Sequence, residues 1–151
     1  MSTQTHYKRP ESVLVVVYTA TKKFLLLRRA DHADFWQSVT GSLLWEESAP
    51  RAAAARELQE ETGLAIDPAS LEDLGLIYRF AILPRWRARY AAGTTENTEH
   101  AFALELPAET ALTIQPSEHS EYVWLPVREA LARASSWTNR EAIEKLARRW
   151  S

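Results

Sequence analysis

Acidic residues gather in one short stretch of this sequence, which reads Arg-Glu-Leu-Gln-Glu-Glu-Thr-Gly-Leu over positions 56–64. On an α-helix, Glu57, Glu60 and Glu61 are spaced i, i+3 and i+4, so all three lie on one face. Like charges at this spacing repel each other by roughly a few tenths of a kcal/mol per pair, and a bound cation would relieve the repulsion. Because the donors are all oxygens, the pattern favours Mg²⁺ or Mn²⁺ over zinc.

Three acids alone could also mark an ordinary surface helix, because charge runs usually form a solvated face. The residues upstream argue against that interpretation, since Glu47 follows Gly41 after five residues. The whole string resembles the signature of the Nudix hydrolases, magnesium-dependent enzymes that cleave a nucleoside diphosphate linked to another group. This resemblance implies an αβα sandwich with a mixed sheet, and it places Glu57, Glu60 and Glu61 among the metal-binding acids.

One spacing departs from that signature. The signature has seven residues between its upstream glutamate and its arginine, whereas eight residues separate Glu47 from Arg56 here. An extra residue inside a helix rotates everything before it, so we expect it near the helix start or in a π-bulge. Positions 57–64 keep their register in either case, and the role of Glu47 stays open.

Segments on both sides of the acidic stretch extend the resemblance over nearly the whole chain. They are residues 7–10, 34–42, 97–99, 118–119 and 136–140. They resemble the branch of the family that removes pyrophosphate from 7,8-dihydroneopterin triphosphate, leaving the monophosphate, early in folate synthesis. The metal ligands that this resemblance implies are Glu57, Glu61 and Glu118, with Glu60 as a further catalytic acid. The residues that it places toward the substrate are Lys8, Arg29, Thr40, Phe80, Ala81, Ile82, Leu83 and Ser136.

Phosphate binding cannot rest on a glycine-rich loop in this chain. It has four glycines and neither a GxGxxG nor a GxxxxGK motif, so phosphate cradles of those types are excluded. A metal ion would hold the phosphates instead, with basic side chains around it. For each basic residue the ordinary alternative is a solvated surface cation. The candidates are Lys8, Arg9, Arg28, Arg29, Arg85, Arg87 and Arg89.

A general base and a platform for the substrate's ring each have two candidates. Glu118 precedes a predicted strand, and a loop carboxylate there could bind the metal or accept a proton from the attacking water. His119 is the alternative base, or else a surface residue. Trp36 and Phe80 are the candidates for stacking on a ring, although most aromatic side chains in such a domain belong to the core.

Strands are predicted where β-branched and apolar residues run or alternate, and a central helix where Pro50 can open it and Gly63 can end it. The predicted strands are residues 12–18, 23–27, 36–39, 74–80, 99–106 and 122–126. The predicted helices are Pro50–Thr62, 126–134 and 138–150, the last with a capping box from Thr138 to Glu141. Helices interleaved with strands indicate the α/β or α+β class, as a single domain over residues 1–151.

Composition limits the remaining classes of protein. Cysteine is absent, which excludes disulfides and Cys-based zinc sites. The longest strongly apolar run, residues 13–18, is too short to span a bilayer, and the formal net charge of −2 gives no overall attraction to nucleic acid. We therefore expect a cytoplasmic enzyme acting on a small pterin or nucleoside triphosphate, with no nucleic-acid or membrane partner, as a monomer or a homodimer.

Two other functions stay open. The chain could be a (deoxy)nucleoside triphosphate pyrophosphohydrolase, or a catalytically inactive Nudix domain that senses a nucleotide. The shifted spacing of Glu47 keeps the inactive domain among the alternatives. The full set of acids argues against it, because a protein that only binds a nucleotide does not need them.

Overall fold

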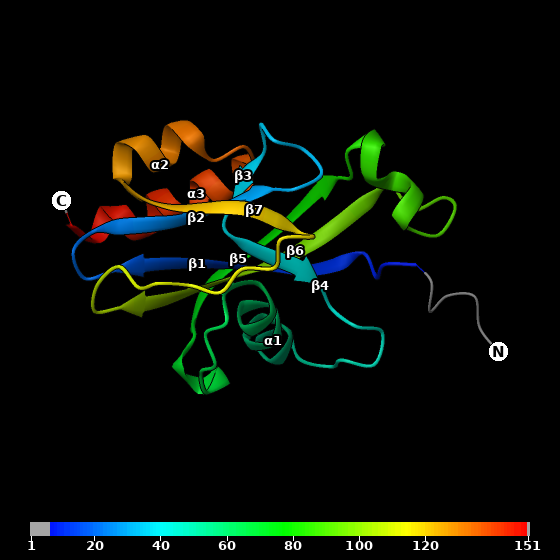
Figure 1. Cartoon of the computed structure of the whole chain (residues 1–151). Helices are drawn as coiled ribbons and strands as arrows, with labels where there is room; N and C mark the ends of the chain where they lie inside the picture. The colour runs from blue at the N-terminus through cyan, green and yellow to red at the C-terminus, as the bar shows by residue number, and fades with distance from the viewer. Residues whose placement is uncertain (1–6, 151) are drawn as a thin grey trace.

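A seven-stranded mixed sheet forms the centre of the structure, a computed structural model that describes residues 7–150 (Figure 1). Its strands are β1 (Glu11–Thr19), β2 (Lys23–Arg29), β3 (Trp36–Gln37), β4 (Val39–Ser42), β5 (Glu72–Ala81), β6 (Glu96–Leu106) and β7 (His119–Pro126). The order along the sheet is β3-β2-β1-β6-β5, with β4 paired to β1 and β7 paired to β2. Strands β1 and β6 are parallel and the other pairs are antiparallel. The predicted mixed sheet is therefore confirmed.

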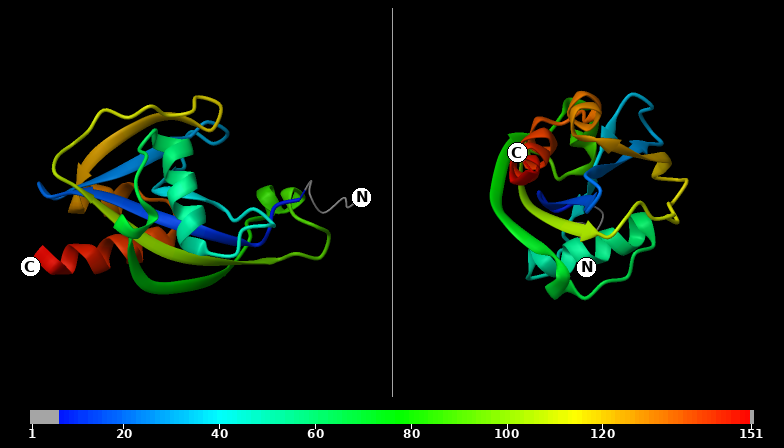
Figure 2. Two further views of the ribbon diagram at one scale, coloured as in Figure 1. Left: turned by 90° about the horizontal axis from the view of Figure 1, so that it is seen from below. Right: turned by 90° about the vertical axis from the view of Figure 1, so that its left-hand side faces the viewer.

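Helices cover both faces of this sheet. Helix α1 (Pro50–Thr62) lies on one face, while α2 (Val127–Arg133) and α3 (Trp137–Ala147) lie on the other (Figures 1 and 2). Each face has its own apolar cluster, and successive residues of β1 contribute alternately to the two. Burial on both sides explains why β1 is an unbroken apolar run rather than an alternating one. The αβα sandwich is confirmed.

Helix α1 has the predicted boundaries. Pro50 occupies the first turn, and Gly63 ends the helix at a φ of 78° while its N–H donates to the Gln59 carbonyl. Ala53, Ala54 and Leu58 pack on the sheet, and Glu61 is buried beside them. The helix therefore presents its acids to the sheet and not only to solvent.

The start of α3 corrects one prediction. Ser136 is the N-cap residue, and its Oγ accepts a hydrogen bond from the backbone N–H of Asn139. The predicted capping box from Thr138 to Glu141 is wrong, because Thr138 already lies inside the helix and its hydroxyl bonds with that of Ser136. Two further differences are that β6 begins at Glu96, earlier than predicted, and that a 3-10 helix forms over Pro84–Arg89.

Strands β1 and β2 separate toward one end of the sheet. They are in register at Tyr18 and Phe24, near the hairpin turn. Further along β1, from Val15 to Ser12, the partner strand is β4 instead of β2. Residues of β1, β2 and β4 line the cavity described below, so the exchange of partners marks the place of the site.

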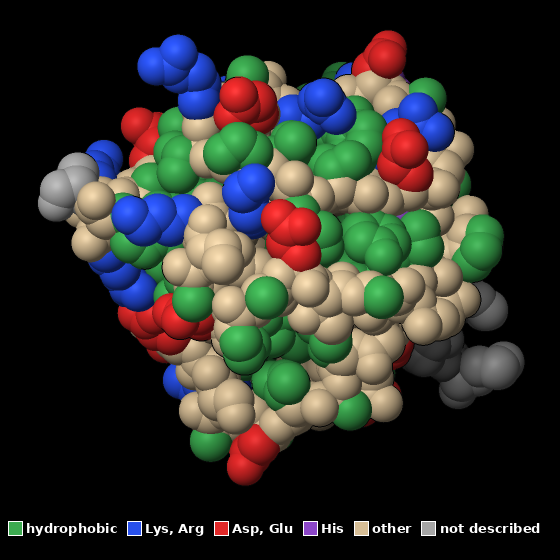
Figure 3. Space-filling model, turned by 60° about the vertical axis from the view of Figure 1, so that its left-hand side comes forward, with side chains coloured by type: hydrophobic (Ala, Val, Ile, Leu, Met, Phe, Trp, Pro, Cys, Tyr) green, Lys and Arg blue, Asp and Glu red, His purple; other side chains and the backbone are tan. Residues whose placement is uncertain are grey.

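Charges of both signs are interspersed on the face of the molecule shown in Figure 3. This mixture agrees with the small formal net charge of −2. In the part of the chain that the structure describes, no helix has the length and apolar character needed to cross a membrane.

Candidate active site

Strand β4 and helix α1 meet where two acids of the signature lie. Glu57 and Glu61 are one helical turn apart, and Glu61 is only 2% exposed. Gly41 in β4 leaves the room for them, because a Cβ at this position would lie 2.1 Å from the Cδ atom of Glu57. The absence of a side chain at Gly41 thus lets the strand backbone approach the carboxylate directly.

Burial opposes the ionisation of these two carboxyl groups. Burial, and next the charge of Glu57, raise the pKa of Glu61 well above its usual value of 4.5. Burial also raises the pKa of Glu57, against the opposing effects of a hydrogen bond with Glu61 and the charge of Arg56. The Oε1 atom of Glu61 has no hydrogen-bond partner. A buried pair of acids with an unpartnered oxygen fits a divalent cation, which would stabilise both negative charges.

Glu118, the predicted third ligand, lies in the loop before β7 and lines the same cavity. Its charge contributes to the raised pKa of Glu61, so it acts on the same pair. Within residues 7–150, no three Asp, Glu, His or Cys side chains are gathered closely enough to hold an ion as they stand. The structure therefore brings Glu57 and Glu61 together and leaves Glu118 on a separate loop.

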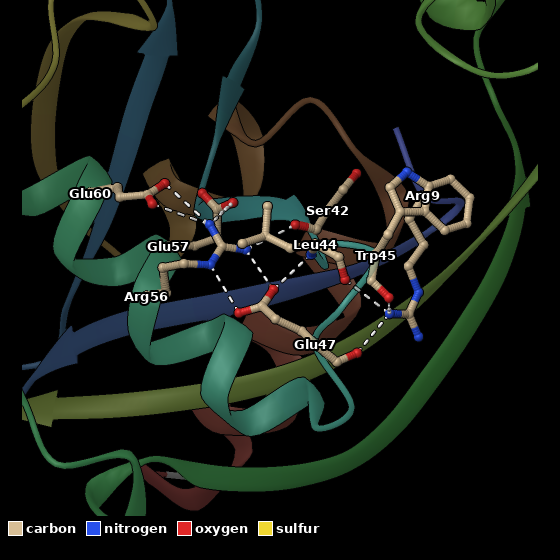
Figure 4. Close-up of polar contacts among 8 residues, drawn as sticks. All are labelled: Arg9, Ser42, Leu44, Trp45, Glu47, Arg56, Glu57 and Glu60. Atoms are coloured by element: carbon tan, nitrogen blue, oxygen red, sulfur yellow. Dashed lines mark hydrogen bonds and ion pairs between the residues drawn. The ribbon is translucent and has the colours of Figure 1, made fainter. Parts of the chain in front are cut away.

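Arg56 pairs with three acids of this region (Figure 4). Its guanidinium donates to both oxygens of Glu47, at 2.9 and 3.0 Å, and to Glu57 at 3.1 Å. It also pairs with Glu60 at 3.2 Å. Glu60 is exposed and lines neither part of the cavity. The catalytic role of Glu60 stays a prediction, and the contact that the structure shows for it is Arg56.

The contact between Glu47 and Arg56 answers the question of the extra residue. Helix α1 is regular throughout and contains no π-bulge. Glu47 lies in the loop before it, where its Oε1 also accepts a hydrogen bond from the N–H of Leu44 at 2.7 Å. The extra residue is therefore absorbed at or before the helix start, and Glu47 still reaches Arg56.

His119 is buried, so its interpretation as a surface residue is wrong. Its Nε2 atom lies 3.2 Å from the side-chain nitrogen of Gln37, which donates to it. Its Nδ1 atom lies 3.9 Å from Oε1 of Glu61. Burial, and next the charge of Arg29, lower the pKa of His119 to about 4. The imidazole is therefore neutral at neutral pH and faces the acid pair.

The acids open into a cavity with two lobes. The first lobe, of about 950 Å³, contains Glu57, Glu61 and Glu118. The second, of about 450 Å³, lies toward the start of α3. The residues that line both lobes are Lys8, Arg29, Gln37, Thr40, Gly41 and Ser42. Because these side chains are shared, the two lobes form one continuous site.

Basic side chains surround the first lobe. Those that line it are Lys8, Arg9, Arg29 and Arg89. Burial, and next the charges of Arg89 and Arg29, lower the pKa of Lys8, as expected where cations converge on a site for an anion. Asp31 joins Arg29 and Arg89, at 2.7 and 3.0 Å. The other three candidate cations, Arg28, Arg85 and Arg87, line neither lobe.

The second lobe is a slot lined by apolar and aromatic side chains together with polar ones. The predicted substrate residues that line it, besides those shared with the first lobe, are Phe80, Ala81, Ile82, Leu83 and Ser136. Trp36 does not line either lobe and belongs to the core, so its prediction as a ring platform is wrong. Four aromatic residues of the slot were not predicted: Phe35, Trp86, Tyr90 and Trp137.

Three buried polar residues that β1 and β6 contribute to the slot also escaped prediction. They are Ser12, Asn97 and Glu99. The sequence carries a signal for two of them, because Asn97 and Glu99 continue the alternation that puts Ala101 and Ala103 in the core. Polar residues at core-facing positions of a strand often mark a site.

The fold and the site together define a class of protein. A protein-family model of the NUDIX domain matches residues 8–146. The chain belongs to the NUDIX domain family, whose members generally use a divalent metal and act on small phosphorylated molecules such as nucleotides or pterins.

Two relatives and one solved structure give a narrower comparison. The chain is 46% identical over 142 residues to the dihydroneopterin triphosphate diphosphatase of Escherichia coli K12, a match covering 92% of this chain and 93% of that protein. It is 41% identical over 142 residues to the protein of the same name from Haemophilus influenzae, covering 92% and 88%. The solved structure of the E. coli dihydroneopterin triphosphate pyrophosphohydrolase matches with a TM-score of 0.85 and 46% identity, covering 92% of this chain and 95% of that one.

Proposed function

We propose that this protein hydrolyses 7,8-dihydroneopterin 3′-triphosphate to the monophosphate and pyrophosphate, with Mg²⁺ or Mn²⁺ as cofactor. The two-lobed cavity carries this proposal, because it joins acids and cations suited to a triphosphate with an aromatic slot suited to a flat ring. Relatives that match over nearly the whole chain bear this activity in their names. A place in folate biosynthesis, in the cytoplasm, is part of the same proposal.

In the proposed complex the triphosphate occupies the first lobe. Lys8, Arg29 and Arg89 supply the positive charge that orients it. A divalent ion held by Glu57 and Glu61, with Glu118 as third ligand, would neutralise phosphate charge and lower the pKa of a bound water. The pterin ring then lies in the second lobe, between the apolar side chains of residues 80–83 and the N-cap residue Ser136.

The water that attacks phosphorus must lose a proton to a nearby group. We assign this role to Glu118, because its carboxylate lines the first lobe from a loop. His119 is less suited, since its Nε2 accepts from Gln37 and its Nδ1 faces Glu61. Glu60 would act through Arg56, whose guanidinium donates to both Glu57 and Glu60.

The direct test is to incubate the protein with magnesium and, separately, with 7,8-dihydroneopterin triphosphate and each deoxynucleoside triphosphate. Pyrophosphate release then gives a specificity constant for each substrate. The proposal expects the pterin triphosphate to rank first. A higher constant for a deoxynucleoside triphosphate would make the protein a nucleotide pyrophosphohydrolase, and no release above an enzyme-free control would make it an inactive binding domain.

A further inference from the structure

A buried acid lies in the second lobe, far along the chain from the signature. Glu99, on β6, is 6% exposed and lines the slot. Its Oε1 atom has no hydrogen-bond partner, although a side-chain hydrogen bond from Thr138 reaches the same carboxyl group. No basic side chain of residues 7–150 forms an ion pair with it. Burial raises the pKa of Glu99 to about 7.

Two further polar groups stand beside this acid. Asn97 lies two residues earlier on β6 and points to the same side of the sheet, and Ser12 is the register partner of Glu99 on the parallel strand β1. The Nδ2 atom of Asn97 donates to the Ser12 hydroxyl at 2.8 Å, while Oδ1 of Asn97 has no partner. Oε1 of Glu99 and Oδ1 of Asn97 are thus two buried acceptor atoms without a partner, on residues that line the slot.

Such a pair of acceptors calls for a ligand with adjacent N–H donors. A buried carboxylate oxygen without a partner costs free energy, and a ligand that donates to it would recover that cost. Aromatic side chains on the walls of the slot, Phe80, Trp86 and Trp137 among them, would hold the faces of a planar ring. Acceptors and aromatic side chains in one pocket suit the recognition of the edge of a heterocycle.

We propose that Glu99 and Asn97 bind the 2-amino-4-oxopyrimidine edge of the substrate's pterin ring. The N3–H and the 2-amino group of that edge are neighbouring donors, and one carboxylate can accept both. Oδ1 of Asn97 accepts the remaining amino hydrogen. Cytosine sets a ring-nitrogen lone pair against the acceptors and thymine sets carbonyl oxygens, so the pocket selects against both bases. This inference rests on the proposed function for its ligand.

The test compares Glu99→Gln with Glu96→Gln, which makes the same chemical change at an exposed position of the same strand. For 7,8-dihydroneopterin triphosphate we expect Glu99→Gln to raise KM at least about tenfold, with kcat within about twofold of wild type. The specificity constants for dCTP and dTTP should not fall, because neither base presents the edge and the amide no longer sets a carboxylate against their acceptors. Glu96→Gln should match wild type throughout.

A binding experiment separates this inference from the proposed function. Fluorescence titration of the wild-type protein with pterin, which carries the edge, and with lumazine, in which oxygen replaces the 2-amino group, needs no turnover. We expect pterin to bind more tightly than lumazine, and Glu99→Gln to abolish the difference. If the protein fails to hydrolyse the pterin triphosphate yet shows this preference, the inference stands and the proposed function falls.

Three results would overturn the role of Glu99. One is a wild-type protein that binds neither compound or binds both equally. Another is a Glu99→Gln variant whose KM for the pterin triphosphate is unchanged. The last is a Glu99→Gln variant whose specificity constants fall equally for all triphosphates, which would make Glu99 a structural residue bound to Thr138.

Discussion

The backbone of Gly41 lies against the carboxylate of Glu57, so closely that a Cβ would fall 2.2 Å from Oε2 and 2.5 Å from Oε1. A glycine on a strand and an acid on a helix thereby form one unit, although fifteen residues separate them in the sequence. The contact fixes where the Glu57 carboxylate lies relative to Glu61.

Replacement of Gly41 by alanine tests this contact. The added methyl group must displace the Glu57 carboxylate, and we expect the affinity for Mg²⁺ to fall about 10- to 100-fold, as when a group that orients a metal ligand is lost. Isothermal titration calorimetry measures the change. Gly75→Ala is the control: a Cβ there meets nothing within 4 Å, and its φ of 70° predicts only a stability loss of about 1–2 kcal/mol. Unchanged magnesium affinity in Gly41→Ala would contradict the packing argument.

Glu61→Gln should separate catalysis from stability. Turnover should fall by orders of magnitude, because the substitution removes a ligand charge. Above pH 7 and without metal, the Glu61→Gln variant should instead be more stable than the wild-type protein. The raised pKa of Glu61 favours folding below the unfolded-state value of 4.5, and that contribution is lost as pH rises toward the folded-state pKa. Thermal melts in EDTA at pH 5 and pH 8 would show it, and a variant less stable than wild type at pH 8 would contradict the raised pKa of Glu61.

Glu99→Gln should show a similar pH dependence at a site without metal. Burial raises the pKa of Glu99 from 4.5 to about 7, so the carboxyl group favours folding below pH 4.5 and loses that contribution as pH rises through 7. Relative to wild type, the variant should gain about 3 kcal/mol of unfolding free energy between pH 4 and pH 8. Urea titrations at several pH values provide the measurement. A difference independent of pH would mean that Glu99 ionises normally.

His119 should be neutral and carry its proton on Nδ1 at pH 6. The side-chain amide of Gln37 donates to Nε2, and the pKa of His119 is lowered to about 4 by burial, then by Arg29. Long-range ¹H–¹⁵N spectra report both the tautomer and the charge. His100 is partly exposed and forms a hydrogen bond with Glu11 at 2.8 Å, so it serves as the internal reference. A protonated His119 ring at pH 6 would refute the assigned environment.

Local signals explain why the sequence predicted α1 so well. Pro50 and Gly63 are restricted to particular helix positions by their backbones, and the acids between them have a fixed register on the helix. At α3 the same reasoning chose the wrong cap, because residues 135–138 offer three hydroxyl groups and only tertiary packing selects Ser136.

Contacts between segments that are distant in the chain could not be predicted from the sequence. Trp36 and Trp137 look alike as aromatic residues, yet Trp36 packs into the core while Trp137 lines the slot. The partner of Glu99 across the strands is Ser12, and nothing local to either residue reveals that β1 and β6 run side by side. Residue types could predict the metal end of the site, whereas the ring end depends on how the strands are ordered.

The central claim is that Glu57 and Glu61 hold a divalent ion inside the first lobe. Electron paramagnetic resonance of Mn²⁺, titrated with wild-type protein in the presence of pyrophosphate, measures this directly. The account predicts that wild-type protein binds the ion and that Glu57→Gln and Glu61→Gln, both folded, bind it at least about tenfold more weakly. Equal Mn²⁺ uptake by all three proteins, or none by the wild type, would contradict it.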